Sequence, residues 1–197
     1  MSKKLWIYGD SLSTDYTRVI AKLDGKTWYE YLSEHFDLEI KNHAKNGHGI
    51  MTVVTEILTT HQEWNLDDLI IVGLPDFFRI SIPQVDNTIT ISDLQNDRGD
   101  KLNQINKDIQ ENGSEWVDNN SKNIWNGLAS TLTHKNINTF FVHKKEGVNS
   151  FNLLHDGDVI DWILETHSYI TPNDKHFSPK GAKDFFNYIL PKINYNG

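Results

Sequence analysis

Short, continuously apolar segments alternate with helical patterns along this chain, and this alternation is the feature that most constrains its fold. The three clearest segments are Leu5-Trp6-Ile7-Tyr8, Leu69-Ile70-Ile71-Val72 and Phe140-Phe141-Val142, and Leu38 to Ile40 is a candidate for a further strand. Uninterrupted apolar segments of this length are typical of strands covered on both faces. Because such strands alternate with helices, the sequence predicts an α/β fold, a three-layer α/β/α sandwich around a central parallel sheet.

Three helices are predicted from their ends and their periodicity. Thr27 and Glu30 have the spacing of a capping box, in which each side chain satisfies the other's backbone amide. Residues 50–58 carry apolar side chains at i, i+3, i+4, i+7 and i+8, which is one face of a helix. Ser178 and Pro179 suit the N-cap and first position of a last helix, which Pro191 ends.

The length of 197 residues fits one domain over residues 1–197, long enough to bury a core. Residues 80–114 are polar and rich in Asn and Asp, and we expect them to form an insertion or a long loop within that domain. A helix from about residue 115 to 134 is expected to follow, with Trp116 and Trp125 as packing residues.

Charge and cysteine content exclude several classes of function. The net charge of −8 argues against a nucleic-acid surface, which needs clustered Lys and Arg. The chain has no cysteine, so thiolate catalysis and cysteine metal sites are excluded. The histidines and carboxylates lack metal-ligand spacing, so no metal or other cofactor is implied. No apolar segment is long enough for a membrane span or signal peptide, and we expect a cytoplasmic protein.

In parallel sheets of this kind the reactive site lies beyond the carboxyl ends of the strands. Ser11 follows the first predicted strand directly, in the stretch Tyr8-Gly9-Asp10-Ser11-Leu12-Ser13. A serine nucleophile needs a base to take its proton, and histidine suits that task because its ordinary pKa lies near neutrality. His176, preceded by Asp174, stands just before the last helix. A turn there would direct both side chains towards the same crevice as Ser11, although Ser11 and Asp174 also fit structural roles in a turn or near a helix start.

These motifs resemble the SGNH (GDSL) hydrolase family in order along nearly the whole chain. Gly9-Asp10-Ser11-Leu12-Ser13 matches the family's first block, residues 174–181 (DKHFSPKG) match its last, and Gly47 stands where the second block has a glycine. The resemblance implies a flavodoxin-like fold, Ser11 as nucleophile and His176 as base. It also implies an oxyanion hole built from the Ser11 and Gly47 amides.

Two departures from the family pattern stand out. The third block is usually Gly-x-Asn-Asp, but here it is Gly73-Leu74-Pro75-Asp76, and proline has no side-chain donor and no amide proton. Asn46, Arg79 or another group is then needed as a substitute donor. The family's acid usually precedes the histidine by three residues, where this chain has Asn173, so we assign the acid to Asp174, two residues before it.

Further residues near the strand ends are candidates for substrate binding. They are Asp10, Asn46, His48, Asp76 and Arg79. Asp10 also fits a structural role, in which it accepts amide hydrogen bonds within its own loop. Phe77 and Phe78 fit either the core or the lining of an acyl or sugar pocket.

The sequence thus predicts a serine ester hydrolase that cleaves a small acyl ester, such as an O-acetyl group on a carbohydrate, through an acyl-enzyme on Ser11. The expected partner is a small-molecule or carbohydrate ester. Two alternatives remain open: a carbohydrate- or ligand-binding module with little or no catalysis, which Pro75 favours, and an assembly protein that uses residues 80–114.

Overall fold

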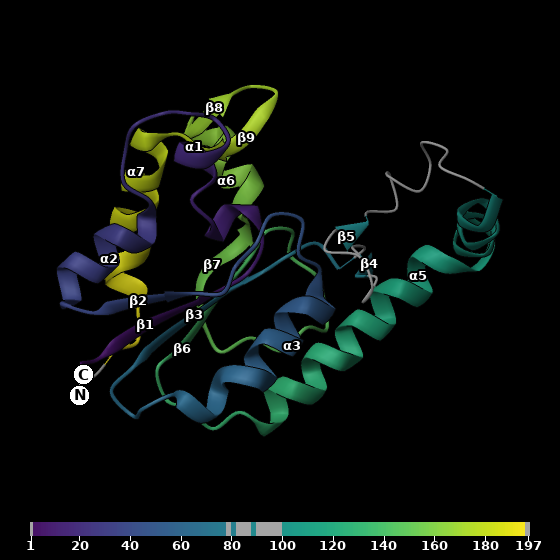
Figure 1. Ribbon diagram of the computed structural model, residues 1–197, viewed down its shortest axis with the longest axis horizontal. Helices are drawn as coiled ribbons and strands as arrows, with labels where there is room; N and C mark the ends of the chain where they lie inside the picture. The colour runs from purple at the N-terminus through teal and green to yellow at the C-terminus, as the bar shows by residue number, and fades with distance from the viewer. Residues whose placement is uncertain (1, 78–79, 82–87, 90–99, 196–197) are drawn as a thin grey trace.

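The computed structural model describes residues 2–77, 80–81, 88–89 and 100–195, and it contains a parallel sheet of five strands (Figure 1). The strands run in the order β2-β1-β3-β6-β7, and each neighbouring pair is parallel. Their bounds are β1 Lys4–Tyr8, β2 Glu39–Asn42, β3 Leu69–Leu74, β6 Ile137–Phe141 and β7 Asn152–Asp158.

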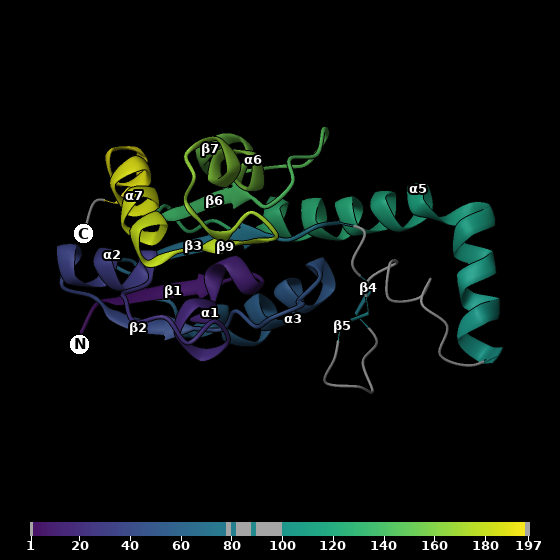
Figure 2. The ribbon, with the colours of Figure 1, turned by 90° about the horizontal axis from the view of Figure 1, so that it is seen from above.

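Helices cover both faces of this sheet (Figures 1 and 2). One face packs against α2 (Trp28–Phe36), α6 (Val159–Glu165) and α7 (Pro179–Ile189), and the other against α3 (Ile50–Thr60) and α5 (Asp100–Thr131). Successive residues of β1 and β3 alternate between the two resulting cores, so these strands are buried on both sides. The predicted three-layer sandwich is confirmed, and its strand order is that of the flavodoxin-like folds.

The strand order reverses at β1, which pairs with β2 on one side and β3 on the other. A crevice at the carboxyl ends of the strands forms at such a reversal. Ser11 lies in a short 3₁₀ helix, η1 (Ser11–Ser13), directly after β1, and α1 (Tyr16–Val19) follows. The topology therefore places Ser11 at the crevice.

The amino ends of β1 and β3 are joined through the buried carboxylate of Asp68. It accepts hydrogen bonds from the Lys4 backbone N at 2.8 Å, the Trp6 Nε1 at 2.8 Å and the Asn65 backbone N at 2.9 Å. A buried carboxylate is tolerated only when its oxygens are satisfied in this way. Asp68 thus fixes the end of the sheet opposite to Ser11.

The helix ends agree closely with the sequence. Thr27 and Glu30 form both halves of the capping box at α2, and Ser178 caps α7, accepting from the Gly181 amide. Helix α5 differs: it begins at Asp100, whereas we expected a start near residue 115. Residues 100–114 of the segment expected as a loop are therefore helical, while residues 82–87 and 90–99 lie outside the described part.

Several short elements were not expected from the sequence. They are β4 (Ile80–Ser81), β5 (Thr88–Ile89), β7, α6, β8 (Tyr169–Thr171), β9 (Asp174–Phe177), η2 (His61–Glu63) and η3 (Leu190–Lys192). Strands β8 and β9 form a separate two-stranded antiparallel sheet. Asp174 and His176 therefore lie on a strand of a hairpin rather than in the turn that we expected. Within the described ranges, no helix is long and apolar enough to cross a membrane.

Gly181, in the first turn of α7, lies directly against the backbone that enters the β8–β9 hairpin. A Cβ atom at this position would lie 2.0 Å from the Ser168 carbonyl oxygen, far inside van der Waals contact. The same carbonyl accepts a hydrogen bond from the Ser178 backbone N at 2.9 Å. Only a glycine permits this approach of α7 to the hairpin.

We therefore expect Gly181→Ala to lower the free energy of unfolding by about 2 kcal/mol, because it overpacks the contact with Ser168. Gly127 in α5 is the matched control, since a Cβ there would meet nothing within 4 Å. Gly127→Ala should raise stability by about 0.5–1 kcal/mol through helix propensity alone. Urea denaturation of both variants measures the difference, and equal effects in the two would contradict the packing argument.

Candidate active site

The turn that carries Ser11 is held by its own backbone and by Asp10. The Asp10 side chain is 1% exposed and accepts a hydrogen bond from the Leu12 backbone N at 3.1 Å. The Ser13 backbone N donates to the Asp10 carbonyl at 2.9 Å. These contacts place Asp10 inside the loop, and Ser11 is left half-buried at its edge.

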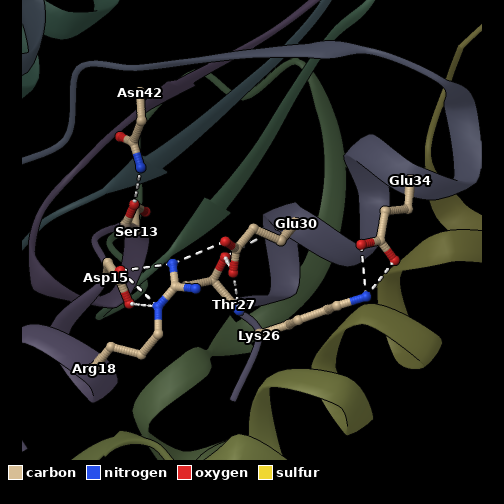
Figure 3. Close-up of polar contacts among 8 residues, drawn as sticks. All are labelled: Ser13, Asp15, Arg18, Lys26, Thr27, Glu30, Glu34 and Asn42. Atoms are coloured by element: carbon tan, nitrogen blue, oxygen red, sulfur yellow. Dashed lines mark hydrogen bonds and ion pairs between the residues drawn. The ribbon is translucent and has the colours of Figure 1, made fainter. Parts of the chain in front are cut away.

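The loop after β2, which contains Gly47, lies against the serine turn. The Lys45 backbone N donates to the Gly9 carbonyl at 3.3 Å, and Asn42 Nδ2 donates to the Ser13 carbonyl at 2.9 Å (Figure 3). Thr14 Oγ1 lies 2.9 Å from Asn46 Oδ1, which ties Asn46 to the same turn. Gly47 itself has a φ of 76°, a left-handed conformation that glycine adopts without strain.

Asp174 and His176 form a hydrogen-bonded pair on β9. His176 Nδ1 lies 2.6 Å from Asp174 Oδ1, and the His176 backbone N donates to the same oxygen at 3.2 Å. With Nδ1–H donated to the carboxylate, Nε2 of a neutral imidazole is left as the proton acceptor. This is the arrangement that a histidine base requires.

Ser11 and His176 line one small cavity, so the structure brings the first and last motifs together. The cavity volume is about 10 Å³, and its other walls include Leu12, Trp28 and Phe177. This is close to the space that a single water molecule needs. Two of these lining residues are joined by a hydrogen bond, which Trp28 Nε1 donates to the Leu12 carbonyl at 2.9 Å.

Tyr16, which the sequence analysis did not single out, stacks on His176. The two ring centroids are 3.4 Å apart and the ring planes differ by 7°. Burial and, after it, the interaction with the negatively charged Asp174 raise the pKa of Tyr16. Its position five residues after Ser11 was the only signal in the sequence.

An ion-pair network holds α1 to the start of α2. Arg18 lies 2.7 Å from Asp15 and 2.8 Å from Glu30, and the second carboxylate oxygen of Glu30 accepts from the Thr27 backbone N at 2.7 Å (Figure 3). The capping box of α2 therefore also anchors the segment that follows Ser11. Because Arg18 is partly exposed, its ion pairs add little stability by themselves.

The other candidate substrate-binding residues lie in different surroundings. His48 is buried, and burial with the nearby Lys45 charge lowers its pKa to about 4, so it is neutral at pH 7. Asp76 is half-buried beyond β3, next to the buried Pro75, and Asn46 is exposed. Arg79 lies outside the described residues.

The two aromatic residues beyond β3 can be placed only in part. Phe77 is fully buried in the core on the α3 side of the sheet, which agrees with the simpler of its two interpretations. Phe78, like Arg79, is not among the described residues.

A further histidine–aspartate pair lies at the carboxyl end of the sheet. His143 follows β6, and its Nδ1 is 3.3 Å from Asp158 Oδ2. This pair is longer than that of His176, and its histidine is 42% exposed against 24% for His176. It provides an internal control for the role of His176.

Neither a protein-family model nor a curated protein sequence matches the chain. Solved structures do resemble it. A lipase from a goat rumen metagenome, Lip_vut3, is 11% identical with a TM-score of 0.53, and the alignment covers 97% of each chain.

Two bacterial structures align at lower TM-scores. A lipase/acylhydrolase from Enterococcus faecalis is 10% identical with a TM-score of 0.45, covering 99% of each chain. A member of the lipolytic protein G-D-S-L family from Veillonella parvula DSM 2008 is 12% identical with a TM-score of 0.46, covering 96% of this chain and 97% of that one. At such identities a likeness reports on the fold alone. Over nearly its whole length, this chain has the α/β fold found in the lipase Lip_vut3.

Proposed function

We propose that this protein is a serine ester hydrolase in which Ser11 is the nucleophile, His176 the base and Asp174 the acid that orients it. The observation that carries the proposal is that Ser11 lines one cavity with a histidine whose Nδ1 is engaged by a carboxylate at 2.6 Å. His176 Nε2 takes the Ser11 proton as the oxygen attacks the acyl carbon, and then returns it to the leaving alcohol. Water activated by the same nitrogen releases the acid from the acyl-enzyme.

The oxyanion is stabilised in this proposal by the backbone amides of Ser11 and Gly47. The hydrogen bonds between the two loops support this assignment, because they hold the Gly47 turn beside the serine turn. Pro75 supplies no third donor. Loss of one oxyanion donor costs roughly 100- to 1000-fold in turnover, so we expect a slow enzyme unless Asn46 or Arg79 substitutes.

The substrate in this proposal carries a small acyl group, for example an O-acetyl group on a carbohydrate. The cavity beside Ser11 supports a small acyl group, since it holds about one water molecule and ends against Trp28 and Phe177. The fold likeness to lipase and acylhydrolase structures supports ester chemistry in general and leaves the alcohol part open.

A second candidate function is ligand binding without cleavage, and Pro75 is the observation that favours it. Proline replaces the residue type that would supply the third donor, so the same cleft would recognise an ester or saccharide and leave it intact. A turnover assay separates the two functions, because a binding module would bind the ester or saccharide while Ser11 stayed unreactive.

Ser11→Ala and His176→Ala should each abolish labelling by a fluorophosphonate and lower the hydrolysis of p-nitrophenyl acetate by at least about 1000-fold. His143→Ala is the matched control, because it removes the histidine of the other pair and should leave both readouts unchanged. A folded wild-type protein that neither labels nor turns over would contradict the hydrolase and favour the binding function.

Asp174→Asn should lower kcat by roughly 1000- to 10,000-fold, because the amide no longer stabilises the imidazolium that forms on His176. Asp158→Asn, at the other histidine–aspartate pair, serves as its control and should keep wild-type kcat. If both substitutions left kcat unchanged, the acid would have to be sought elsewhere than at Asp174.

A further inference from the structure

The β8–β9 hairpin carries His176, but it lies outside the main sheet that carries Ser11. Backbone pairing with the main sheet therefore does not fix the distance between the base and the nucleophile. The hairpin is held instead by contacts of β9 with η1, α1, α6 and α7, and α1 is the segment that follows Ser11 in the chain. Thr17 Oγ1 donates to the Phe177 carbonyl at 2.6 Å, next to His176 in sequence.

Tyr16 makes the closest of these contacts to the reacting groups. Its ring lies flat on the imidazole of His176, with centroids 3.4 Å apart and ring planes that differ by 7°. The hydrogen bond from His176 Nδ1 to Asp174 fixes one edge of the imidazole but leaves the ring free to tilt about it. A flat aromatic ring on the imidazole face removes that remaining freedom.

We propose that Tyr16 is a positioning residue of this active site, holding the plane of the His176 imidazole by stacking. The inference rests on the proposed function, and it adds a fourth side chain to the Ser11, His176 and Asp174 arrangement. Because Tyr16 is five residues from Ser11 in the same segment, it also couples the orientation of the base to the position of the nucleophile.

A role of Tyr16 in positioning the base and a role in contacting the substrate predict different kinetics for Tyr16 variants. If Tyr16 positions the base, Tyr16→Leu should lower kcat and the fluorophosphonate labelling rate roughly 10- to 100-fold with KM little changed, since a misplacement of about 1 Å can cost about 100-fold. Tyr16→Phe keeps the ring that stacks on the imidazole, so it should recover most of this loss, staying within about 10-fold of wild type.

Tyr188 offers a matched control, because it is another tyrosine whose ring contacts a histidine. Its hydroxyl lies 2.8 Å from His155 Nδ1, and the ring centroids are 5.6 Å apart. Tyr188→Leu and Tyr188→Phe should leave kcat unchanged. A drop in kcat for Tyr188→Leu equal to that for Tyr16→Leu would overturn the inference, as would a change in KM alone for Tyr16→Leu, which identifies a substrate contact.

A second measurement does not depend on turnover. In NMR spectra of the histidine rings, the carbon-bound protons of His176 should be shifted upfield by the Tyr16 ring current, and Tyr16→Phe should preserve that shift. Tyr16→Leu should remove it, with circular dichroism used to check that the variant is folded. Should Tyr16→Leu fail to fold, the wild-type and Tyr16→Phe spectra still decide the question.

Failure of this inference can be told apart from failure of the proposed function. An active wild-type protein whose His176 protons show no upfield shift, or whose kcat survives Tyr16→Leu, overturns the role of Tyr16 alone. A wild-type protein in which Ser11 is inert overturns the hydrolase. In that case the presence of the shift supports Tyr16 as the residue that positions His176, and its absence overturns that role.

Discussion

The candidate active site depends above all on how the β8–β9 hairpin is held against the rest of the molecule. Asp174 and His176 lie on this separate two-stranded sheet. Among the contacts that hold it are the start of α7, where Gly181 allows the Ser168 carbonyl to approach closely, and α1, through Thr17 and Tyr16. Strand β9 also packs against α6. A single methyl group added at Gly181 would disturb the first of these contacts and, with it, the position of the proposed base relative to Ser11.

Ser11, the proposed nucleophile, is positioned by the main sheet instead. Ser11 directly follows β1, which is buried on both faces and paired on both edges. Hydrogen bonds from Asn42 and Lys45 tie its turn to the end of β2 and to the loop that follows. Asp68 fixes the opposite end of β1 and β3. In the proposed mechanism, a fixed serine turn therefore faces a histidine whose position is set by packing.

The surroundings of the site are consistent with a hydrolase of small acyl esters that works slowly. The cavity between Ser11 and His176 is small, and Trp28 and Phe177 limit its depth. Pro75 directly follows β3, at the position where the family pattern that the motifs resemble has an asparagine. The remaining donors in the proposal are the backbone amides of Ser11 and Gly47. Their positions depend on the two loops that carry them, which are hydrogen-bonded to each other, rather than on side-chain conformation.

The sequence by itself determined the layers and the capped starts of α2 and α7, because burial on both faces and end-capping are local properties, but it misplaced the start of α5. Leu69 to Val72 indicated a central strand, and Thr27, Glu30 and Ser178 indicated helix starts, all as the structure has them. The sequence also singled out Ser11, Asp174 and His176 as reactive residues. Only the tertiary structure decided that Ser11 and His176 line one cavity and that Tyr16 stacks on the imidazole. Residues 11 and 176 lie at opposite ends of the chain, and no local pattern encodes how far apart packing will place them.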